Sequence, residues 1–231
     1  MRFKSAITFT VLGLFVPVLA QAHVSIQSGA AFAQVSDVVI FGVGHGCEGD
    51  DATLDTTSVT VEIPAGVGSV RPELSGFDEV SLKTDKTGAV VAVTWTKEKA
   101  LPDDISYYEL KLRLKAPDAP FTIIPFPTYQ SCTSADGKTE AVVDWVGAPG
   151  DKDAEPAPLL YVLPARFPGW NQFEVPEDIE DLAGFFSDAQ IVWSGKSAYS
   201  INPATVELIA DTDGVSSLSK IKAGSKIWVK Y

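Results

Sequence analysis

The segment YYELKLRL, residues 107–114, alternates strictly between two kinds of side chain. Tyrosine and leucine occupy its even-numbered positions, whereas Glu109, Lys111 and Arg113 occupy three of its odd-numbered positions. A period of two residues is typical of a β-strand with one buried and one solvated face. The segment therefore predicts a sheet strand that covers a hydrophobic core on one side.

Similar strand patterns recur along the chain and are separated by turn signals. Residues 58–63 and 89–95 are rich in β-branched side chains, and turn-forming residues stand at 64–68 and 85–88. Long amphipathic helical patterns do not separate these runs, which favours an antiparallel sandwich over a parallel α/β sheet. We therefore predict a mainly β fold, with an antiparallel β-sandwich over residues 23–150.

The pattern changes in the last third of the chain. Residues 147–158, GAPGDKDAEPAP, show no periodicity, and we interpret them as a linker or a long crossing loop. Residues 175–189 carry an early proline and early acids before apolar residues at helical spacing, which predicts one helix. We expect residues 151–231 to form a small α+β extension packed on the sandwich. Its large aromatic residues should form its core, with a partner-binding face as the alternative. These residues are Trp170, Trp193, Tyr199 and Trp228.

The first 22 residues have the pattern of a secretory signal peptide. Arg2 and Lys4 precede an uncharged apolar run, and small residues stand two apart at Ala20 and Ala22. We expect cleavage after Ala22 and a periplasmic or secreted mature chain without a transmembrane segment. The signal carries two of the 18 basic residues and none of the 30 acids, so the mature chain has a net charge of −14. Such a chain should repel nucleic acid and anionic lipid.

Cys47 and Cys132 are the two cysteines of the chain. An exported protein meets an oxidising compartment, where a pair of cysteines normally forms a disulfide. We therefore predict a Cys47–Cys132 bond, which would close a long loop and stabilise the fold by about 4 kcal/mol. The alternative is a soft-metal site made by Cys47 and the neighbouring His45, which requires a free thiolate.

His23 would become the amino-terminal residue after cleavage. The α-amine and the ring Nδ1 of an amino-terminal histidine can close one chelate ring on a metal ion. Nitrogen ligands of this kind suit Cu(II), which also leads the divalent metals in affinity. An α-amine titrates near pH 7.7 to 8, so protons should compete with the metal in acid. The alternative is that His23 follows the cleavage site by accident.

Several segments of the chain resemble the YcnI-like family of secreted bacterial copper-binding domains. They are AHVSI, GHGCEGDDAT, VTVEIPAGV, AVTWTKEKALPDDISYYELKLRL, FPTYQSC and DGKTEAVVDW, between residues 22 and 147. The resemblance implies a single-histidine brace for Cu(II), completed by a carboxylate and a nearby tryptophan. Residue by residue, it implies His23 and Glu109 as metal ligands and Trp145 beside the metal. Glu140 or Asp144 is the alternative carboxylate.

These features together predict a copper-binding protein that acts in copper homeostasis rather than an enzyme. Its expected partners are the copper ion and a copper chaperone or a membrane copper transporter. No serine–histidine–acid arrangement with motif support and no glycine-rich phosphate loop is present in the sequence. One alternative is a polysaccharide oxygenase, for which His45 would have to supply the second imidazole. A metal-free interaction module is the other.

Overall fold

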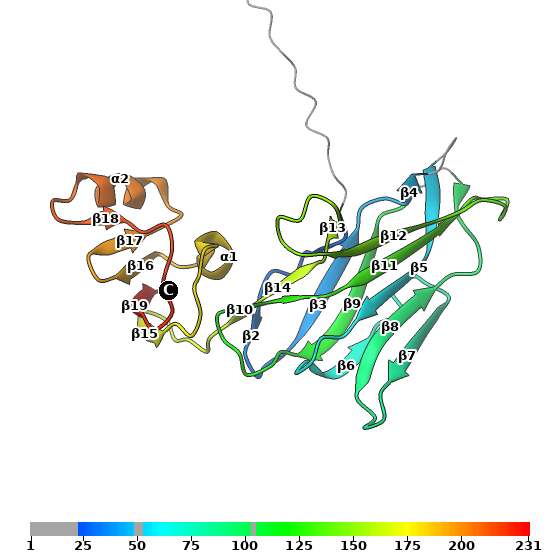
Figure 1. The fold of residues 1–231 in the computed structure, drawn as a ribbon, viewed down its shortest axis with the longest axis horizontal. Coiled ribbons are helices and arrows are strands. Elements are labelled where there is room, and N and C mark those ends of the chain that lie inside the picture. The colour runs from blue at the N-terminus through cyan, green and yellow to red at the C-terminus, as the bar shows by residue number, and fades with distance from the viewer. Residues whose placement is uncertain (1–22, 49–52, 103–104) are drawn as a thin grey trace, which may run out of the picture.

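The computed structural model describes residues 23–48, 53–102 and 105–231. The predicted signal peptide, residues 1–22, lies outside the described residues. Strands dominate the structure, which confirms the prediction of a mainly β chain. Figure 1 shows a sandwich of β-sheets and, beside it, a smaller unit built from the C-terminal part of the chain. None of the helices in the described part of the chain is long and apolar enough to span a membrane.

The first sheet of the sandwich has four antiparallel strands, which follow one another across the sheet. In spatial order they are β1 (Ser25–Ile26), β3 (Ser36–Val43), β9 (Tyr108–Lys115) and β6 (Gly68–Pro72). The alternating segment of the sequence forms β9, whose three leucines are fully buried while the charged residues between them face outward.

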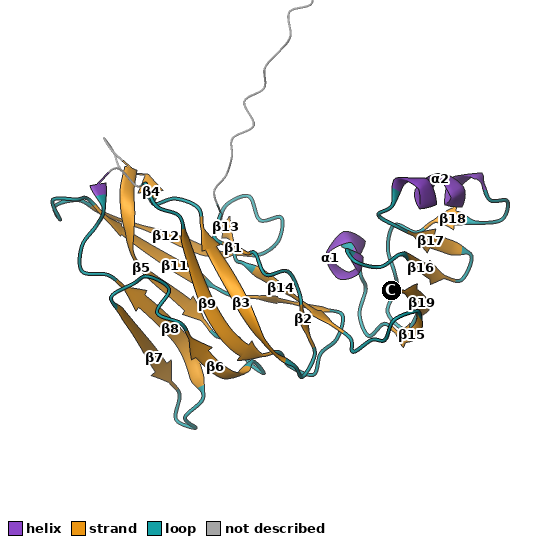
Figure 2. Cartoon of the chain, turned by 180° about the vertical axis from the view of Figure 1, so that it is seen from behind, coloured by secondary structure: helices purple, strands orange, loops and turns teal. Residues whose placement is uncertain are grey.

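The second sheet has seven strands and packs against the first (Figure 2). Six of them follow the order β13 (Glu155–Pro156), β12 (Glu140–Gly147), β11 (Thr128–Thr133), β5 (Thr53–Glu62), β8 (Val90–Thr96) and β7 (Glu79–Thr84). The seventh, β4 (Cys47–Glu48), pairs with one end of β5. All neighbours in this sheet are antiparallel except β12 and β13, which run parallel.

A third, small sheet closes one end of the sandwich. Its strands are β10 (Thr122–Pro125), β14 (Leu159–Leu163) and β2 (Ala31–Phe32), with β14 in the middle. The expected boundary at residue 150 thus precedes two strands, β13 and β14, that pair with strands of the sandwich. The chain leaves the sandwich after Leu163.

A continuous hydrophobic core fills the space between the two large sheets. Trp95, Phe41 and Phe126 are its largest fully buried side chains, and the leucines of β9 pack among them. Fully burying one such side chain stabilises the fold by about 1.5–3 kcal/mol. This core includes Trp145, so the candidate site stands on a rigid support.

The predicted disulfide between Cys47 and Cys132 is confirmed. The two Cα atoms are 5.7 Å apart, and the bond joins β4 to β11. Both sulfurs are therefore bonded to each other, which removes the thiolate that a Cys47–His45 metal site would need.

The C-terminal unit is a five-stranded sheet with two short helices. Its strands lie in the order β15 (Trp170–Glu174), β19 (Lys226–Lys230), β16 (Ile191–Ser194), β17 (Ser197–Tyr199) and β18 (Ser216–Ser217). The helices are α1 (Leu182–Phe186) and α2 (Pro203–Asp211). Only α1 falls within the segment for which a helix was predicted. The sequence analysis missed α2, although Asn202 caps it and Pro203 starts it, a recognisable signal.

The C-terminal unit has a hydrophobic core of its own. Phe185 and Phe186 of α1 pack there with Val192, Ile227 and Val229. Tyr199 packs against this core as predicted, whereas Trp170, Trp193 and Trp228 do not belong to it. Trp170 and Trp228 are 52% and 47% exposed, and Trp193 is partly exposed. The expectation that the three tryptophans form this core is therefore wrong, because strand residues alternate between two faces and the inward positions next to Trp193 and Trp228 belong to Val192 and Val229.

The two cores meet where β14 ends. Leu163 and Phe121 extend from the sandwich into the core of the C-terminal unit. Beside them Arg166 lies over the rings of Phe32 and Tyr231, at 4.9 and 4.1 Å from the ring centroids. Its guanidinium also forms a two-pronged ion pair with Asp188. These contacts link the C-terminal unit to the sandwich.

Candidate metal site

His23, the first described residue, lies at the edge of the main core. Its Nδ1 is 3.3 Å from Oε2 of Glu155, and its ring meets the ring of Trp145 edge to face, with centroids 5.4 Å apart. The side chain of His23 is 29% exposed and that of Glu155 is 46% exposed. An imidazole, a carboxylate and an indole therefore meet at one place that solvent can reach.

The pairing of β12 with β13 explains why these groups meet. Trp145 and Glu155 are direct partners across the two parallel strands, so both side chains emerge at the same level. Gly147 permits the close approach of the strands, because a Cβ at this position would lie 2.8 and 2.9 Å from the carbonyl oxygens of Ala154 and Glu155. A larger residue at this position would force β13 away from Trp145.

A cavity of about 500 Å³ adjoins His23. Its wall consists of residues 150–156, the middle of the segment that the sequence analysis interpreted as a linker or crossing loop. These residues include Asp151, Asp153 and Glu155 beside a single cation, Lys152. The loop thus gives the histidine a surrounding rich in carboxylates, which favours a cation over an anion.

A buried glutamine holds Trp145 in place. Gln130 is 1% exposed, and its Oε1 accepts a hydrogen bond from Trp145 Nε1 at 3.1 Å. Its Nε2 donates to the carbonyl of His45 and to the hydroxyl of Thr56, each at 2.8 Å. The indole nitrogen is therefore occupied by a protein partner. Gln130 was not singled out from the sequence, although a glutamine in the buried row of β11 is an unusual feature.

Glu109, the expected carboxylate ligand, is not brought to His23. It lies exposed on the outer face of β9 and accepts a hydrogen bond from Tyr107 at 3.3 Å. The leucines next to it point the other way, into the core that contains Trp145. Since successive strand residues face opposite sides, Glu109 and Trp145 lie on opposite sides of the first sheet.

The alternative carboxylates are also turned away from the indole. Glu140 and Asp144 occupy exposed even-numbered positions of β12, whereas Trp145 occupies a buried odd-numbered one. The carboxylate that does reach His23 belongs to Glu155, in a segment without any periodic pattern. No signal in the sequence could have singled it out.

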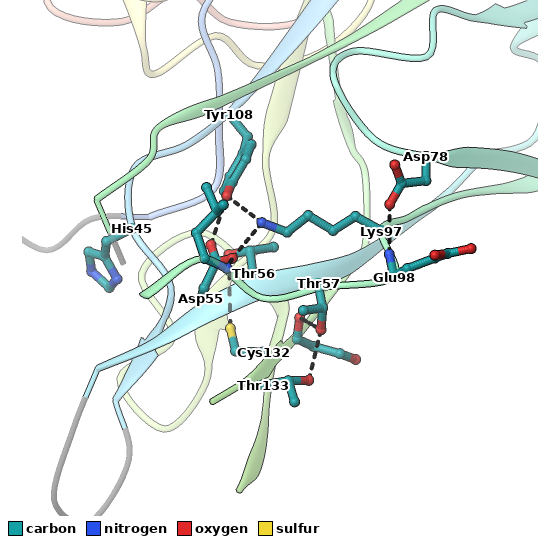
Figure 3. A network of polar contacts seen from close by, with 12 residues as sticks. His45, Asp55, Thr56, Thr57, Asp78, Lys97, Glu98, Tyr108, Cys132 and Thr133 are labelled. Atoms are coloured by element: carbon teal, nitrogen blue, oxygen red, sulfur yellow. Dashed lines mark hydrogen bonds and ion pairs between the residues drawn. The ribbon is translucent and has the colours of Figure 1, made fainter. Parts of the chain in front are cut away.

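His45 approaches the site through its backbone rather than its ring. Its carbonyl oxygen accepts the hydrogen bond from Gln130, and its ring Nδ1 contacts the carbonyl of Gly46. Figure 3 shows the ring turned away from the neighbouring polar network. The structure therefore brings His23 and Trp145 together but does not add the imidazole of His45 to them.

The network in Figure 3 has the buried carboxylate of Asp55 at its centre. The carboxylate of Asp55 accepts hydrogen bonds from Lys97 Nζ at 2.5 Å, from the hydroxyl of Tyr108 at 2.7 Å and from the backbone N–H of Leu101. Burial raises the pKa of Tyr108, so its hydroxyl stays protonated and donates to the carboxylate. These contacts connect β5 and the end of β8 to β9. The network therefore ties the two large sheets together.

The side chains alone do not form a closed metal cage. Across residues 23–48, 53–102 and 105–231, no three histidine, cysteine, aspartate or glutamate side chains converge as a metal site. The donors at His23 are one imidazole and one carboxylate. A metal bound there would need a further ligand, and the α-amine of a processed chain would supply it.

Comparisons with known proteins identify a protein family that covers the sandwich. A family model described as "Domain of unknown function (DUF1775)" matches residues 23–162. The chain is similar to an uncharacterized protein from Nocardia farcinica whose crystal structure reveals an immunoglobulin-like fold; the identity is 29%, the match covers 62% of this chain and 99% of that one, and the TM-score is 0.46. It is also similar to a 35 kDa C-terminal fragment of the major pilin GBS80 of Streptococcus agalactiae, at 8% identity over 90% of this chain and 77% of that one, with a TM-score of 0.32. No curated protein matches.

Proposed function

The chain belongs to the DUF1775 family, and from this premise and the geometry at His23 we propose that it is an exported Cu(II)-binding protein of copper homeostasis. In this proposal it sequesters or delivers the metal and does not turn over a substrate. The observation that carries the proposal is the position of the His23 imidazole between the Trp145 ring and the Glu155 carboxylate. The resemblance to YcnI-like copper-binding domains supports the same reading.

The available donors match the chemistry of Cu(II). Cleavage after Ala22 would free the α-amine of His23, which would chelate copper together with Nδ1. Glu155 would add a carboxylate oxygen, since its Oε2 already lies beside Nδ1. Trp145 would shield one side of the metal from water without binding it through nitrogen, because Gln130 holds its N–H.

A binding role fits the donor set better than oxygenase chemistry. A copper oxygenase needs a second imidazole, and the ring of His45, the other histidine of the chain, is turned to its own loop. A site with one imidazole should hold Cu(I) less firmly than Cu(II), so reduction would release the metal to a recipient.

The test is the role of the free amino terminus. A chain that begins at His23 should bind Cu(II) at least about 100-fold more tightly than a chain that keeps Ala22, because an amide nitrogen cannot replace the amine in the chelate ring. Competition titration with a Cu(II) chelator measures the affinity, and electron paramagnetic resonance reports the ligands. A chain with one alanine added after Tyr231 is the control and should behave like the mature chain. Equal affinities of the two amino-terminal forms would contradict the proposal.

A further inference from the structure

Three tryptophans gather on the solvent side of the C-terminal sheet. Trp228 of β19 pairs directly with Trp193 of β16, and Trp170 of β15 lies two positions further along the neighbouring strand. Trp170 and Trp228 are about half exposed, and Trp193 is partly exposed. The residues that alternate with them, Val192 and Val229, are buried in the core below.

These rings border an open hollow of about 340 Å³. Its lining consists of the three tryptophans and Gly195. The volume lies at the lower end of the range for ligand sites, which is about 300–1,000 Å³. Exposed aromatic groups of this size are unfavourable in water, and clusters of them mark binding surfaces. We call the three tryptophans the tryptophan face.

Hydrogen-bond donors with positive charge surround the tryptophan face. Lys226 and Lys230 flank Trp228 along β19 on the same side of the sheet, and Gln172 is its direct partner on β15. Lys196 follows Gly195 in the turn beside the hollow. Within the described residues, none of these lysines forms an ion pair. Glu174 is the one acidic residue in the register of this patch.

We propose that the tryptophan face binds an acidic saccharide, a chain of pyranose rings that carry carboxylates. The flat faces of a pyranose ring present C–H groups that pack on indole rings, while its rim presents oxygens that accept hydrogen bonds. The carboxylates match the ammonium groups of Lys226, Lys230 and Lys196. Each part of this ligand therefore has a counterpart on the face.

The charges on the face argue against a cationic ligand. Aromatic surfaces can hold a quaternary ammonium group, but the flanking lysines would repel it. The chain as a whole is acidic, so the attraction is local. At physiological ionic strength charges beyond about 8 Å are largely screened, and the ligand meets mainly the lysines around the tryptophans.

The test is a titration of the full mature chain with hexagalacturonate, followed by calorimetry and tryptophan fluorescence. We expect saturable binding that weakens as salt is added. Trp228→Ala and Trp170→Ala should each weaken it at least about tenfold, by removing a stacking surface. Leu208→Ala, which truncates another exposed apolar residue of the same unit, is the matched control and should leave binding unchanged.

Lys226→Gln and Lys230→Gln keep the tryptophans and the fold, so they test the charge match even if a tryptophan variant unfolds. Each should weaken binding and reduce its salt dependence. No binding at millimolar hexagalacturonate, or equal binding of neutral cellohexaose, would overturn the proposal. So would binding of vesicles of phosphatidylglycerol and phosphatidylcholine in place of the saccharide, or self-association that Trp228→Ala abolishes. None of these outcomes depends on copper.

Discussion

Among individual residues, Gln130 connects the parts of the candidate metal site through one side-chain amide. Its oxygen accepts a hydrogen bond from the indole N–H of Trp145, and its nitrogen donates to the carbonyl of His45 and the hydroxyl of Thr56. The contacts with Trp145 and Thr56 are buried, and the contact with His45 is partly buried. A buried polar group without a partner destabilises the fold by about 1–3 kcal/mol. A single amide thus fixes the ring that packs against His23.

Gln130→Met keeps the size of the side chain but removes its hydrogen bonds. We expect the free energy of unfolding to fall by about 2–4 kcal/mol, since several buried groups lose their partner. Denaturant unfolding measures this loss, and the side-chain N–H signal of Trp145 should exchange faster with solvent. Gln190→Met, at an exposed position, is the control. Equal stabilities of the two variants would show that Gln130 does not carry these contacts.

Two glutamates distinguish the expected site from the observed one. Glu155→Gln removes the charge beside His23 and should weaken Cu(II) binding of the mature chain by about 10- to 100-fold. Glu109→Gln is the matched control, because Glu109 lies on the outer face of β9, and it should leave the affinity unchanged. Competition titration gives both values. The reverse result would restore the ligand set implied by the family resemblance.

The sequence and its family resemblance pointed to His23 and Trp145, but not to Glu155, whose carboxylate lies beside His23. His23 stands directly after a cleavage pattern, whereas Trp145 was implied only by the resemblance to the YcnI-like family. Glu155 acts through β13, a strand of two residues that pairs in parallel with β12. A pairing this short leaves no periodic pattern, because two residues are too few to alternate.

Among the strands, β13 is only two residues long, yet it carries the carboxylate of the candidate site. Gly147→Ala should push it away from β12, because the new methyl group would meet two backbone oxygens that cannot move independently. We expect a loss of about 1–3 kcal/mol in unfolding free energy and weaker Cu(II) binding. Gly68→Ala, where a Cβ would have open space, is the control and should be neutral or slightly stabilising. An unchanged copper affinity in Gly147→Ala would show that the position of β13 does not matter.

The strands of the sandwich were accessible to sequence analysis because each has one face in the core. In β19 the same alternation places Ile227 and Val229 inside and Trp228 outside. A buried Trp228 was predicted because large aromatic residues usually lie in a core. The alternation of the strand instead decides the face, and it places Trp228 on the outer one. A helix does form within the predicted segment, residues 175–189, but α1 occupies only its short part Leu182–Phe186.

Across the full chain, two hydrophobic cores are joined at the end of β14. Tyr161 of β14 packs its ring on Phe185 of α1 and donates its hydroxyl to Asp181, the residue that caps α1. Gly184 leaves room for this ring, since a Cβ there would lie 2.2 Å from it. This contact between the sandwich and the C-terminal unit requires a protonated Tyr161, because only the neutral hydroxyl can donate to Asp181.

Burial and the bond to Asp181 raise the pKa of Tyr161 to about 12, from its ordinary value of 10. Because the folded state holds the proton more tightly, this contribution to stability is complete below pH 10 and is lost as the pH rises toward 12. Denaturant unfolding between pH 9 and 12 should show the loss. Tyr161→Phe keeps the ring and should show a smaller pH dependence in this window. Identical pH profiles for the two proteins would exclude Tyr161 as its source.

The position of β19 has a consequence for the order in which the chain folds as it is made. This strand comes last in the sequence, yet it lies between β15 and β16 and supplies Ile227 and Val229 to the second core. The sandwich has all of its strands once residue 163 has emerged, whereas the C-terminal sheet lacks an inner strand until residue 230. Folding along the direction of synthesis therefore completes the sandwich first. Until β19 has been synthesised, the edges of β15 and β16 that pair with it expose unpaired backbone N–H and C=O groups. A chaperone that binds the nascent chain would cover these edges during this interval.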